Sequence, residues 1–360
     1  MKVNLSAPNI GDSEIEAVTR VLRSGNLAQG REVENFENEF SSYMSGYHCI
    51  AVNSGTSALH LSLLAIGIGP GDEVIVPSFS FAASANSIAI TGATPIFVDI
   101  DPETFCLDVM SVEAAITSKT VGILPVHLYG NPAPLQELSR LCAKYGLFLL
   151  EDAAQAHFAA IDGKPVGTFG QGGCFSFYPT KNMTSGEGGM VVTSDEAIAA
   201  RVRLLRNQGM KTRYQNEIVG LNNRMTDIHA AIGRVQLNRL SEFTAKRIAN
   251  AEFLNKNLVG VVTPQVRSGY THVFHQYTIL TLGMARSDFQ ASLQAKGVAC
   301  EVYYPTPIHQ LPSFNQQIEL PVTKLISENC LSIPVHPSLS KENLEFLVES
   351  VNDTAKDLSK

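Results

Sequence analysis

The chain has 360 residues, of which 44% are hydrophobic and 17% are charged. This length suits one large domain and a smaller one, and the apolar content allows a sizeable core, which excludes a disordered protein. The formal net charge is −7, and the sequence has no block of like charges. These features argue against a nucleic-acid-binding protein, which needs a basic surface.

The N-terminal residues, the lack of long apolar stretches and the cysteines lead us to expect a cytoplasmic protein. Residues 1–5 lack the continuous apolar core of a signal peptide, and no stretch reaches the ~18 uninterrupted apolar residues of a membrane helix. The cysteines are scattered, so they suggest neither zinc ligation nor a disulfide framework, and we expect reduced, mostly buried thiols and no metal site. They are Cys49, Cys106, Cys142, Cys174, Cys300 and Cys330.

The first predicted element is an amphipathic helix. Asp12 or Ser13 is its expected N-cap, and Gly25 is expected to end it. Its predicted apolar stripe consists of Ile15, Val18, Val21 and Leu22.

From residue 50 to 193, short apolar runs alternate with helical segments. The runs do not alternate in polarity, as expected of strands that are covered on both faces, so the pattern predicts an α/β fold with a mostly parallel sheet between helices. The predicted strands are 73–76, 95–99, 121–126, 147–150, 174–178 and 190–193. One predicted helix follows Ser57, and two others span 82–91 and 135–144.

The last third of the chain has a different order of elements. A long helix is predicted from about residue 225 to 258. It is followed by a strand over 276–280, a helix over 287–295, a strand over 298–304 and an amphipathic helix over 341–360. We therefore expect a large domain over residues 1–240 and a small C-terminal α+β domain over 241–360.

A run of small and hydroxylated residues, Ser54 to Ser57, stands just before a predicted helix. The free N–H groups of a helix start can hold an anion, and the hydroxyls of Ser54, Thr56 and Ser57 can add donors. An ordinary N-cap is the alternative, and the segment alone favours it, since serine and threonine are good caps.

Asp152 closes a strongly apolar predicted strand. In open α/β sheets, ligands bind beyond the carboxyl ends of the strands, so this carboxylate is well placed to face a bound cationic group. The alternative is an aspartate that caps the next loop.

Lys181 lies between an apolar β-like run and the glycine-rich segment 186–189. A desolvated lysine loses its proton more readily and becomes a nucleophilic amine that can form a Schiff base with a carbonyl. Ser176 lies five residues earlier, and Pro179 breaks the strand between them, so a kinked loop could return both side chains to one pocket. A surface lysine in a loop is the alternative.

The order of these three features is more informative than each feature alone. A helix start suited to a phosphate, an aspartate at a strand end and a lysine suited to a Schiff base match the phosphate, the pyridinium nitrogen and the aldehyde of pyridoxal 5′-phosphate. Downstream, Asn222 and Arg224 precede the long helix and could reach a neighbouring site, whereas Asp227 is expected to cap or solvate the helix start.

Taken together, the motifs of the chain resemble those of the DegT/DnrJ/EryC1/StrS family of sugar aminotransferases, and the likeness runs over nearly the whole length. The resemblance implies the pyridoxal-phosphate-dependent transferase type I fold, with a seven-stranded type of sheet. The motifs lie at 10–11, 24–27, 54–59, 71–77, 151–157, 175–189, 222–225 and 303–309.

The resemblance also implies a role for individual residues. Lys181 would hold pyridoxal 5′-phosphate as an internal aldimine and move protons, and Asp152 would pair with the pyridinium nitrogen. Gln155 would bond the ring hydroxyl, and Phe81 would stack on the ring. The phosphate would be held by Gly55, Thr56, Ser57 and Ser176, with Asn222 supplied by the other subunit of a homodimer. Tyr304 and His309 would meet the sugar.

By the same resemblance, the protein would transfer an amino group from L-glutamate to a keto group of a nucleotide-linked sugar or deoxysugar. Some relatives carry histidine in place of the lysine and catalyse dehydration, and Lys181 favours transamination. Phe158 stands where the family commonly has glycine, so the loop behind the cofactor is expected to be reshaped. The alternatives are a pyridoxal-phosphate-dependent deoxysugar dehydratase and a non-catalytic pyridoxal-phosphate-binding regulator.

Overall fold

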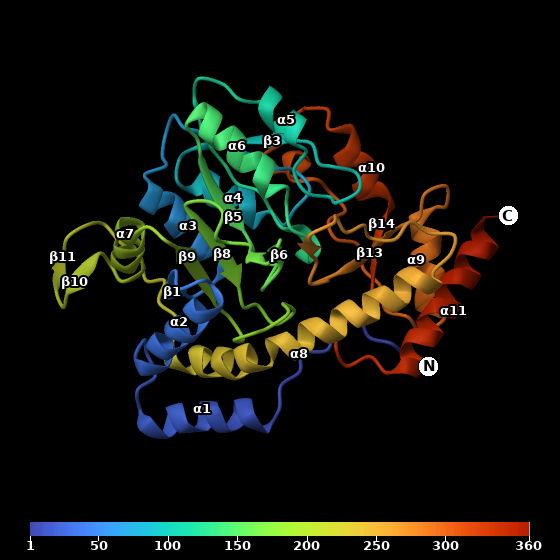
Figure 1. The fold of residues 1–360 in the computed structure, drawn as a ribbon, viewed down its shortest axis with the longest axis horizontal. Helices are drawn as coiled ribbons and strands as arrows, with labels where there is room; N and C mark the ends of the chain where they lie inside the picture. The colour runs from blue at the N-terminus through green and yellow to red at the C-terminus, as the bar shows by residue number, and fades with distance from the viewer. Residues whose placement is uncertain (360) are drawn as a thin grey trace.

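The computed structural model describes residues 1–359, and its centre is a seven-stranded sheet in the order β1-β9-β8-β5-β4-β2-β3 (Figure 1). Strand β9 is antiparallel to both of its neighbours, and the other adjacent pairs are parallel. The mostly parallel sheet predicted from the sequence is therefore confirmed. Its strands are β1 His48–Val52, β2 Glu73–Pro77, β3 Thr94–Val98, β4 Thr120–Ile123, β5 Phe148–Asp152, β8 Gly172–Ser176 and β9 Gly189–Thr193.

Helices pack against the sheet and bury its central strands, of which β5, β8 and β9 are buried at every residue. Helix α3 contacts β8 and β9, α6 contacts β4 and β5, and α7 contacts β1 and β9. Strands buried on both faces carry apolar side chains at most positions, which explains why their sequences do not alternate in polarity. The helices of this region are α2 Arg31–Tyr43, α3 Gly55–Ile66, α4 Ala83–Ile90, α5 Val109–Ala114, α6 Leu135–Tyr145 and α7 Glu196–Arg206.

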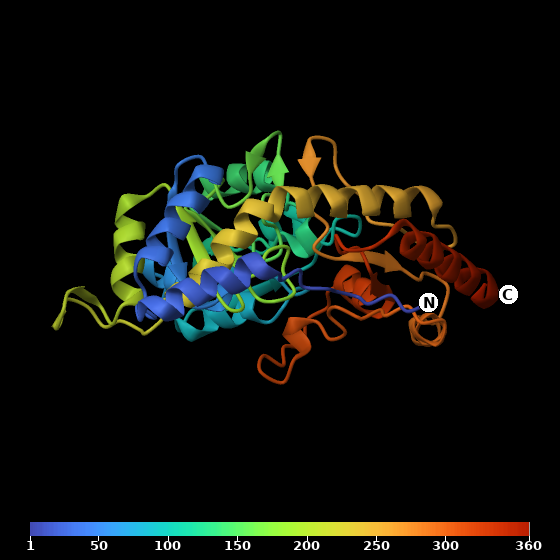
Figure 2. The ribbon, with the colours of Figure 1, turned by 90° about the horizontal axis from the view of Figure 1, so that it is seen from below.

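The long helix α8, Asp227–Asn257, runs along the molecule from the sheet to a second, smaller group of elements (Figures 1 and 2). Those elements bury an apolar core of their own, to which α8 contributes Ala251 and Leu254. Residue 240 lies inside α8, so the chain passes between the two cores without a linker, and the division at residue 240 stays a prediction. The smaller group contains β13 Tyr277–Leu280, α9 Arg286–Ala295, β14 Cys330–Ile333 and α11 Lys341–Leu358, whose predicted last residue, 360, lies outside the described part.

Short elements complete the described chain. The hairpin of β10 and β11 projects from the large domain at the end away from both termini (Figure 1). These elements are β6 Ala160–Ile161, β7 Lys164–Pro165, β10 Met210–Thr212, β11 Gln215–Asn216, β12 Tyr270–Thr271, α10 Pro321–Asn329 and the 3₁₀ helices η1 Leu128–Gly130 and η2 Ile308–Gln310. Within residues 1–359, no helix combines the length and the apolar character needed to cross a membrane.

Helix α1, Asp12–Ser24, differs in detail from its prediction. The expected caps Asp12 and Ser13 are wrong, because the N-cap is Gly11, whose N–H donates to the Glu14 carboxylate at 2.9 Å. Gly25 ends the helix in the left-handed conformation, as predicted. Ile15 is exposed, because the face that packs on α8 carries the buried Glu14 instead. The face turned to α8 consists of Glu14, Ala17 and Val21, whereas Leu22 of the predicted stripe is also exposed.

The predicted strand over 298–304 is wrong. Only two isolated bridges form there, Val298 with Val3 and Glu301 with Ser332, and the rest of the segment is irregular. The apolar residues of this segment do pack against the two cores, but they do so from a loop and do not pair in a β-ladder. The six cysteines are all buried and free, as expected.

Asp227 connects the start of α8 to the start of α2. Its predicted role in capping or solvating its own helix is wrong, because it is buried and the N-cap is Thr226, whose hydroxyl oxygen accepts from the N–H of His229. Its carboxylate accepts hydrogen bonds from the N–H groups of Gly30 at 2.7 Å and Val33 at 3.1 Å. Since the carboxylate is buried, its removal leaves two N–H groups of the α2 start without a partner.

We expect Asp227→Ala to lower the free energy of unfolding by about 1–3 kcal/mol in urea titrations. Asp12→Ala, a change at an exposed position of α1, is the control and is expected to have a small effect.

Candidate active site

A cavity of about 650 Å³ opens at the carboxyl ends of β5 and β8, beside the first turn of α3. Its wall also includes segments from α4, from the loop after β8 and from the region before β13. Most of the predicted site residues line it, namely Gly55, Thr56, Phe81, Asp152, Gln155, Ser176, Lys181 and Tyr304. The kinked loop after β8 thus returns Ser176 and Lys181 to one cavity.

The start of α3 keeps two backbone donors free at the cavity. Ser54 is an N-cap, since its hydroxyl oxygen accepts from the N–H of Ser57 at 3.1 Å. No described residue accepts a hydrogen bond from the N–H of Gly55 or Thr56. The N-cap interpretation is therefore confirmed, because the cap satisfies the third N–H group. Anion binding stays a prediction, and the first two N–H groups are available for it.

Gly55 lets this helix start approach β8 closely. A Cβ atom at position 55 would lie 2.7 Å from the Cβ atom of Ser176, a separation that side chains do not tolerate. The glycine therefore brings the free N–H groups and the Ser176 hydroxyl to the same wall of the cavity.

The carboxylate of Asp152 is buried and hydrogen-bonded on both oxygens. Oδ2 accepts from the hydroxyl of Ser84 at 2.7 Å, and Oδ1 accepts from the N–H of Ala154 at 3.1 Å. Burial raises the pKa of Asp152, and these two hydrogen bonds, together with the positive charge of Lys181, oppose the rise. The carboxylate is therefore held in one orientation, facing a cavity that contains an amine.

The Lys181 side chain is half-buried, and its amine forms no hydrogen bond or ion pair with any residue in 1–359. Burial lowers the pKa of Lys181 to about 8, while the Asp152 carboxylate favours the charged form. An amine with this pKa has a substantial neutral fraction at physiological pH, and the neutral form is the nucleophile.

The orientation of the Gln155 amide is fixed by its neighbours. The carbonyl Oε1 accepts from the N–H of Tyr129 at 2.7 Å, so the NH₂ group must point the other way. Nε2 donates to the Tyr304 hydroxyl at 2.9 Å, which leaves its second proton for a ligand. Because the Tyr304 oxygen is an acceptor here, its own proton is also free to donate to an acceptor in the cavity.

Two aromatic residues near the site have different surroundings. Phe81 is 60% exposed, and its ring lies 6.1 Å from that of Tyr304 at the mouth of the cavity. Phe158 does not line the cavity; its ring stacks on Tyr43 at 4.6 Å and lies 5.9 Å from Phe40. Its φ of 63° is the left-handed conformation that favours glycine. The side chain is therefore accommodated by packing on α2.

Three predicted site residues do not line this cavity. Ser57 takes part in the α3 cap. Asn222 is exposed, and its amide oxygen accepts from Arg224 at 3.1 Å. His309 is buried, with Nδ1 2.6 Å from the hydroxyl of Ser78. His309 thus connects the segment after Tyr304 to the end of β2, and its role toward the sugar stays a prediction.

Sequence reasoning missed several residues of the cavity wall. Ser80 and Ser84 lie on either side of Phe81, and the proportion of serine in this segment is the only signal that could have identified them. His275 and Gln276 come from a distant part of the chain and had no local signal. The cavity wall also contains Tyr178, Thr180, Glu187 and Tyr303.

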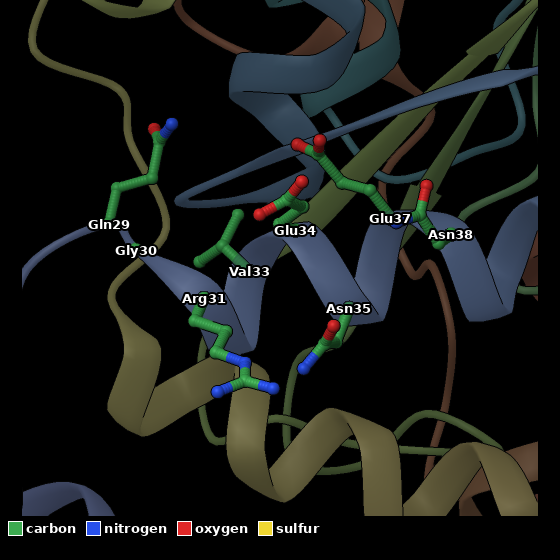
Figure 3. Close-up of a pocket in the computed structure, with 8 residues that line it drawn as sticks. All are labelled: Gln29, Gly30, Arg31, Val33, Glu34, Asn35, Glu37 and Asn38. Carbon is green, nitrogen blue, oxygen red and sulfur yellow. The ribbon is translucent and has the colours of Figure 1, made fainter.

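Figure 3 shows a second cavity, of about 670 Å³, along α2. Glu34 and Glu37 project from one side of the helix, and Arg31 and Asn35 from the other. None of the predicted site residues lines this cavity, and Glu37 is already paired with Arg206 at 2.5 Å. The chemistry-bearing side chains gather in the first cavity.

The fold and the first cavity define the chain as an aminotransferase of the type I fold. The sequence pattern of the DegT/DnrJ/EryC1/StrS aminotransferase family matches residues 8–352. The chain therefore belongs to this family.

Two relatives and two solved structures show the range of the likeness. A "pleiotropic regulatory protein" of Geobacillus stearothermophilus is 40% identical over 94% of this chain and 93% of its own length. A UDP-N-acetyl-3-dehydro-alpha-D-glucosamine 3-aminotransferase of Acidithiobacillus ferrooxidans is 39% identical over 95% of this chain and 94% of its own.

Both solved structures share the fold closely. DesV of S. venezuelae, determined in complex with a ketimine intermediate, has a TM-score of 0.92 and 38% identity, covering 95% of this chain and 94% of that one. The PLP-form of the putative sugar aminotransferase Spr1654 of Streptococcus pneumoniae has a TM-score of 0.94 and 26% identity, covering 99% and 100%.

The lowered pKa of Lys181 leads to a direct test on the chain freed of cofactor. We expect labelling of this amine by an amine-reactive reagent, followed by mass spectrometry of the peptide, to rise with a midpoint near pH 8, instead of the ~10.4 of an exposed lysine. Asp152→Asn removes the charge that raises the pKa, so its midpoint is expected to be lower still. A midpoint near pH 10 in both proteins would contradict the burial of the amine.

Proposed function

We propose that this protein is a pyridoxal-phosphate-dependent aminotransferase that transfers an amino group from L-glutamate to a keto group of a nucleotide-linked sugar. The observation that carries the proposal is the convergence of an unpaired amine, a buried carboxylate and a helix start with free N–H groups in one cavity. The named activities of the relatives support the sugar substrate. The buried free cysteines suit an enzyme of the cytoplasm.

The residues of the cavity fit pyridoxal 5′-phosphate. The free N–H groups of Gly55 and Thr56, with Ser176, suit the phosphate, and the Asp152 carboxylate suits a protonated pyridine nitrogen. Gln155 has a proton to donate to the ring oxygen, and Phe81 presents an exposed aromatic face. When bound, the cofactor supplies an aldehyde that condenses with amines and a ring that withdraws electrons.

The chain's own contribution to the reaction centres on Lys181. Its amine has no competing partner within residues 1–359, so it would be free to bond the aldehyde of a bound cofactor and to take up or deliver a proton. With a pKa of about 8, it can act in both directions near neutral pH. When ionised, the Asp152 carboxylate would pair with a protonated pyridine nitrogen, and this pairing would maintain the electron demand of the ring.

A regulatory role is the second candidate, because the Geobacillus stearothermophilus relative is named a regulatory protein. A protein that only binds the cofactor would not convert it. The visible absorbance of the purified, cofactor-loaded protein distinguishes the two roles: bleaching on addition of L-glutamate supports the aminotransferase, and an unchanged spectrum supports the regulator.

Lys181→Ala is expected to reduce sugar amination by at least about a thousandfold, since the change removes both the covalent anchor and the proton carrier. The measurement is the mass of the aminated product formed from L-glutamate and a panel of nucleotide-linked 3- and 4-ketosugars. Lys144→Ala, a change at an exposed lysine paired with Glu113, is the control and should retain activity. Appreciable amination by Lys181→Ala would contradict the assignment.

The same panel, incubated with the wild-type protein, separates transamination from dehydration. An aminotransferase yields aminated sugar in proportion to 2-oxoglutarate, whereas a dehydratase yields a product lighter by one water without consuming glutamate. Because Lys181 can form the covalent anchor, we expect the aminated product.

We further propose a homodimer in which Asn222 serves the cavity of the partner subunit, since it is exposed and lies outside its own cavity. Mixing inactive Lys181→Ala with a weakened Asn222→Ala protein is then expected to restore about a quarter of the wild-type activity after subunit exchange. Half of the dimers would be mixed, and each would contain one intact site. No recovery in demonstrably mixed dimers would show that Asn222 does not act across the interface.

A further inference from the structure

Two serine hydroxyls, linked by a hydrogen bond, connect the cavity to the buried Asp152. Ser84, in the first turn of α4, is 1% exposed, and its Oγ lies 2.7 Å from Oδ2 of Asp152. Ser80, 3% exposed and also in the cavity wall, places its Oγ 3.1 Å from the Oγ of Ser84. Neither residue belongs to the set that the sequence suggested for cofactor or sugar binding.

The direction of these two hydrogen bonds follows from the single proton that each serine hydroxyl carries. An ionised carboxylate only accepts, so the single hydroxyl proton of Ser84 is donated to Asp152. Ser84 can then only accept from Ser80, which uses the proton of Ser80. A hydroxyl that accepts one hydrogen bond is a better donor in the next, so Ser80 strengthens the bond from Ser84 to the carboxylate.

The other groups that act on Asp152 come from several elements. Lys181 of the loop after β8 and His127 of the segment after β4 favour the ionised carboxylate. Cys174 on β8 and Tyr304 lie near enough to interact with the Asp152 charge. Burial raises the pKa of Asp152, and the hydrogen bond from Ser84 is the largest opposing influence. Loss of this bond therefore favours the protonated acid, which cannot pair with a protonated pyridine nitrogen.

We propose that Ser84 is a positioning residue that keeps the Asp152 carboxylate ionised and aimed into the cavity, and that Ser80 supports it from the cavity side. The inference rests on the proposed function, because the consequence for the reaction runs through a pyridine nitrogen. The serine pair itself acts on the carboxylate whether or not a cofactor is bound.

The test measures the dissociation constant of pyridoxal 5′-phosphate from the full-length chain as a function of pH, after removal of any bound cofactor. In the wild type, affinity falls as the pH is lowered through the pKa of Asp152. For Ser84→Ala, the midpoint of this fall is expected to move up by about one pH unit, with about a tenfold loss of affinity on the acid side. Ser80→Ala is expected to give a smaller shift in the same direction.

Ser87→Ala is the matched control, because Ser87 is a buried serine of the same helix whose hydroxyl donates to the Ser84 backbone carbonyl and not to the carboxylate. Its midpoint is expected to stay at the wild-type value. A loss of affinity by Ser84→Ala that is equal at all pH values, or an equal shift in Ser87→Ala, would show a structural role only and overturn the proposal.

A second measurement separates this inference from the proposed function. The ¹³C resonance of the Asp152 carboxyl, identified by its loss in Asp152→Asn, is titrated in the cofactor-free chain. A higher midpoint in Ser84→Ala than in the wild type supports the proposed role of the two serines, even if the wild type fails to bind pyridoxal 5′-phosphate. That failure would contradict the proposed function alone. An unchanged midpoint overturns the proposed role of the serines even if the wild type binds the cofactor tightly.

Discussion

The structure of the site depends on one electrostatic constraint: a buried acid and a half-buried amine share one cavity. Burial favours the neutral form of each group, raising the pKa of Asp152 and lowering that of Lys181, whereas their mutual attraction favours the charged forms. For the acid, the hydrogen bonds from Ser84 and Ala154 oppose the effect of burial, which remains the larger influence on its pKa. The amine receives no such hydrogen bonds, and its pKa of about 8 gives it a larger neutral fraction at physiological pH than an exposed lysine has.

The sheet explains why these groups meet. β5 and β8 are adjacent and parallel, so Asp152 and Ser176 both stand at carboxyl ends on the same edge of the sheet. The neighbouring Glu151 points to the opposite side, where it accepts from the N–H groups of Phe169 at 2.7 Å and Gly170 at 3.1 Å and from His127 at 3.1 Å. Nδ1 of His127 accepts from Ala133, which places the ring proton on Nε2, facing Glu151. Two consecutive buried carboxylates are thus satisfied on opposite faces, one for structure and one for the cavity.

Local signals in the sequence predicted the sheet well and the details of contacts poorly. The buried strands were recognisable because strands covered on both faces carry apolar residues without alternation. The prediction of the α1 cap was wrong because the N-cap is Gly11, whose N–H donates to the Glu14 carboxylate, and no side chain of Asp12 or Ser13 is the cap. The prediction of a strand over 298–304 was wrong because apolar content alone does not supply a neighbouring strand with which to pair. Helix α2 was overlooked although Val33, Phe36 and Phe40 have helical spacing and are buried.

By itself, the sequence determined the sheet, the family and the residues with reactive groups, because strand burial and motif order are properties of neighbouring positions along the chain. Only the tertiary structure decided how those groups behave. The pKa of Lys181 depends on atoms from distant segments, the donor direction of Gln155 depends on Tyr129, and the Ser80–Ser84–Asp152 chain joins a helix start to a strand end 68 residues away. Such properties arise from distances and from the exclusion of water, and both exist only after the chain has folded.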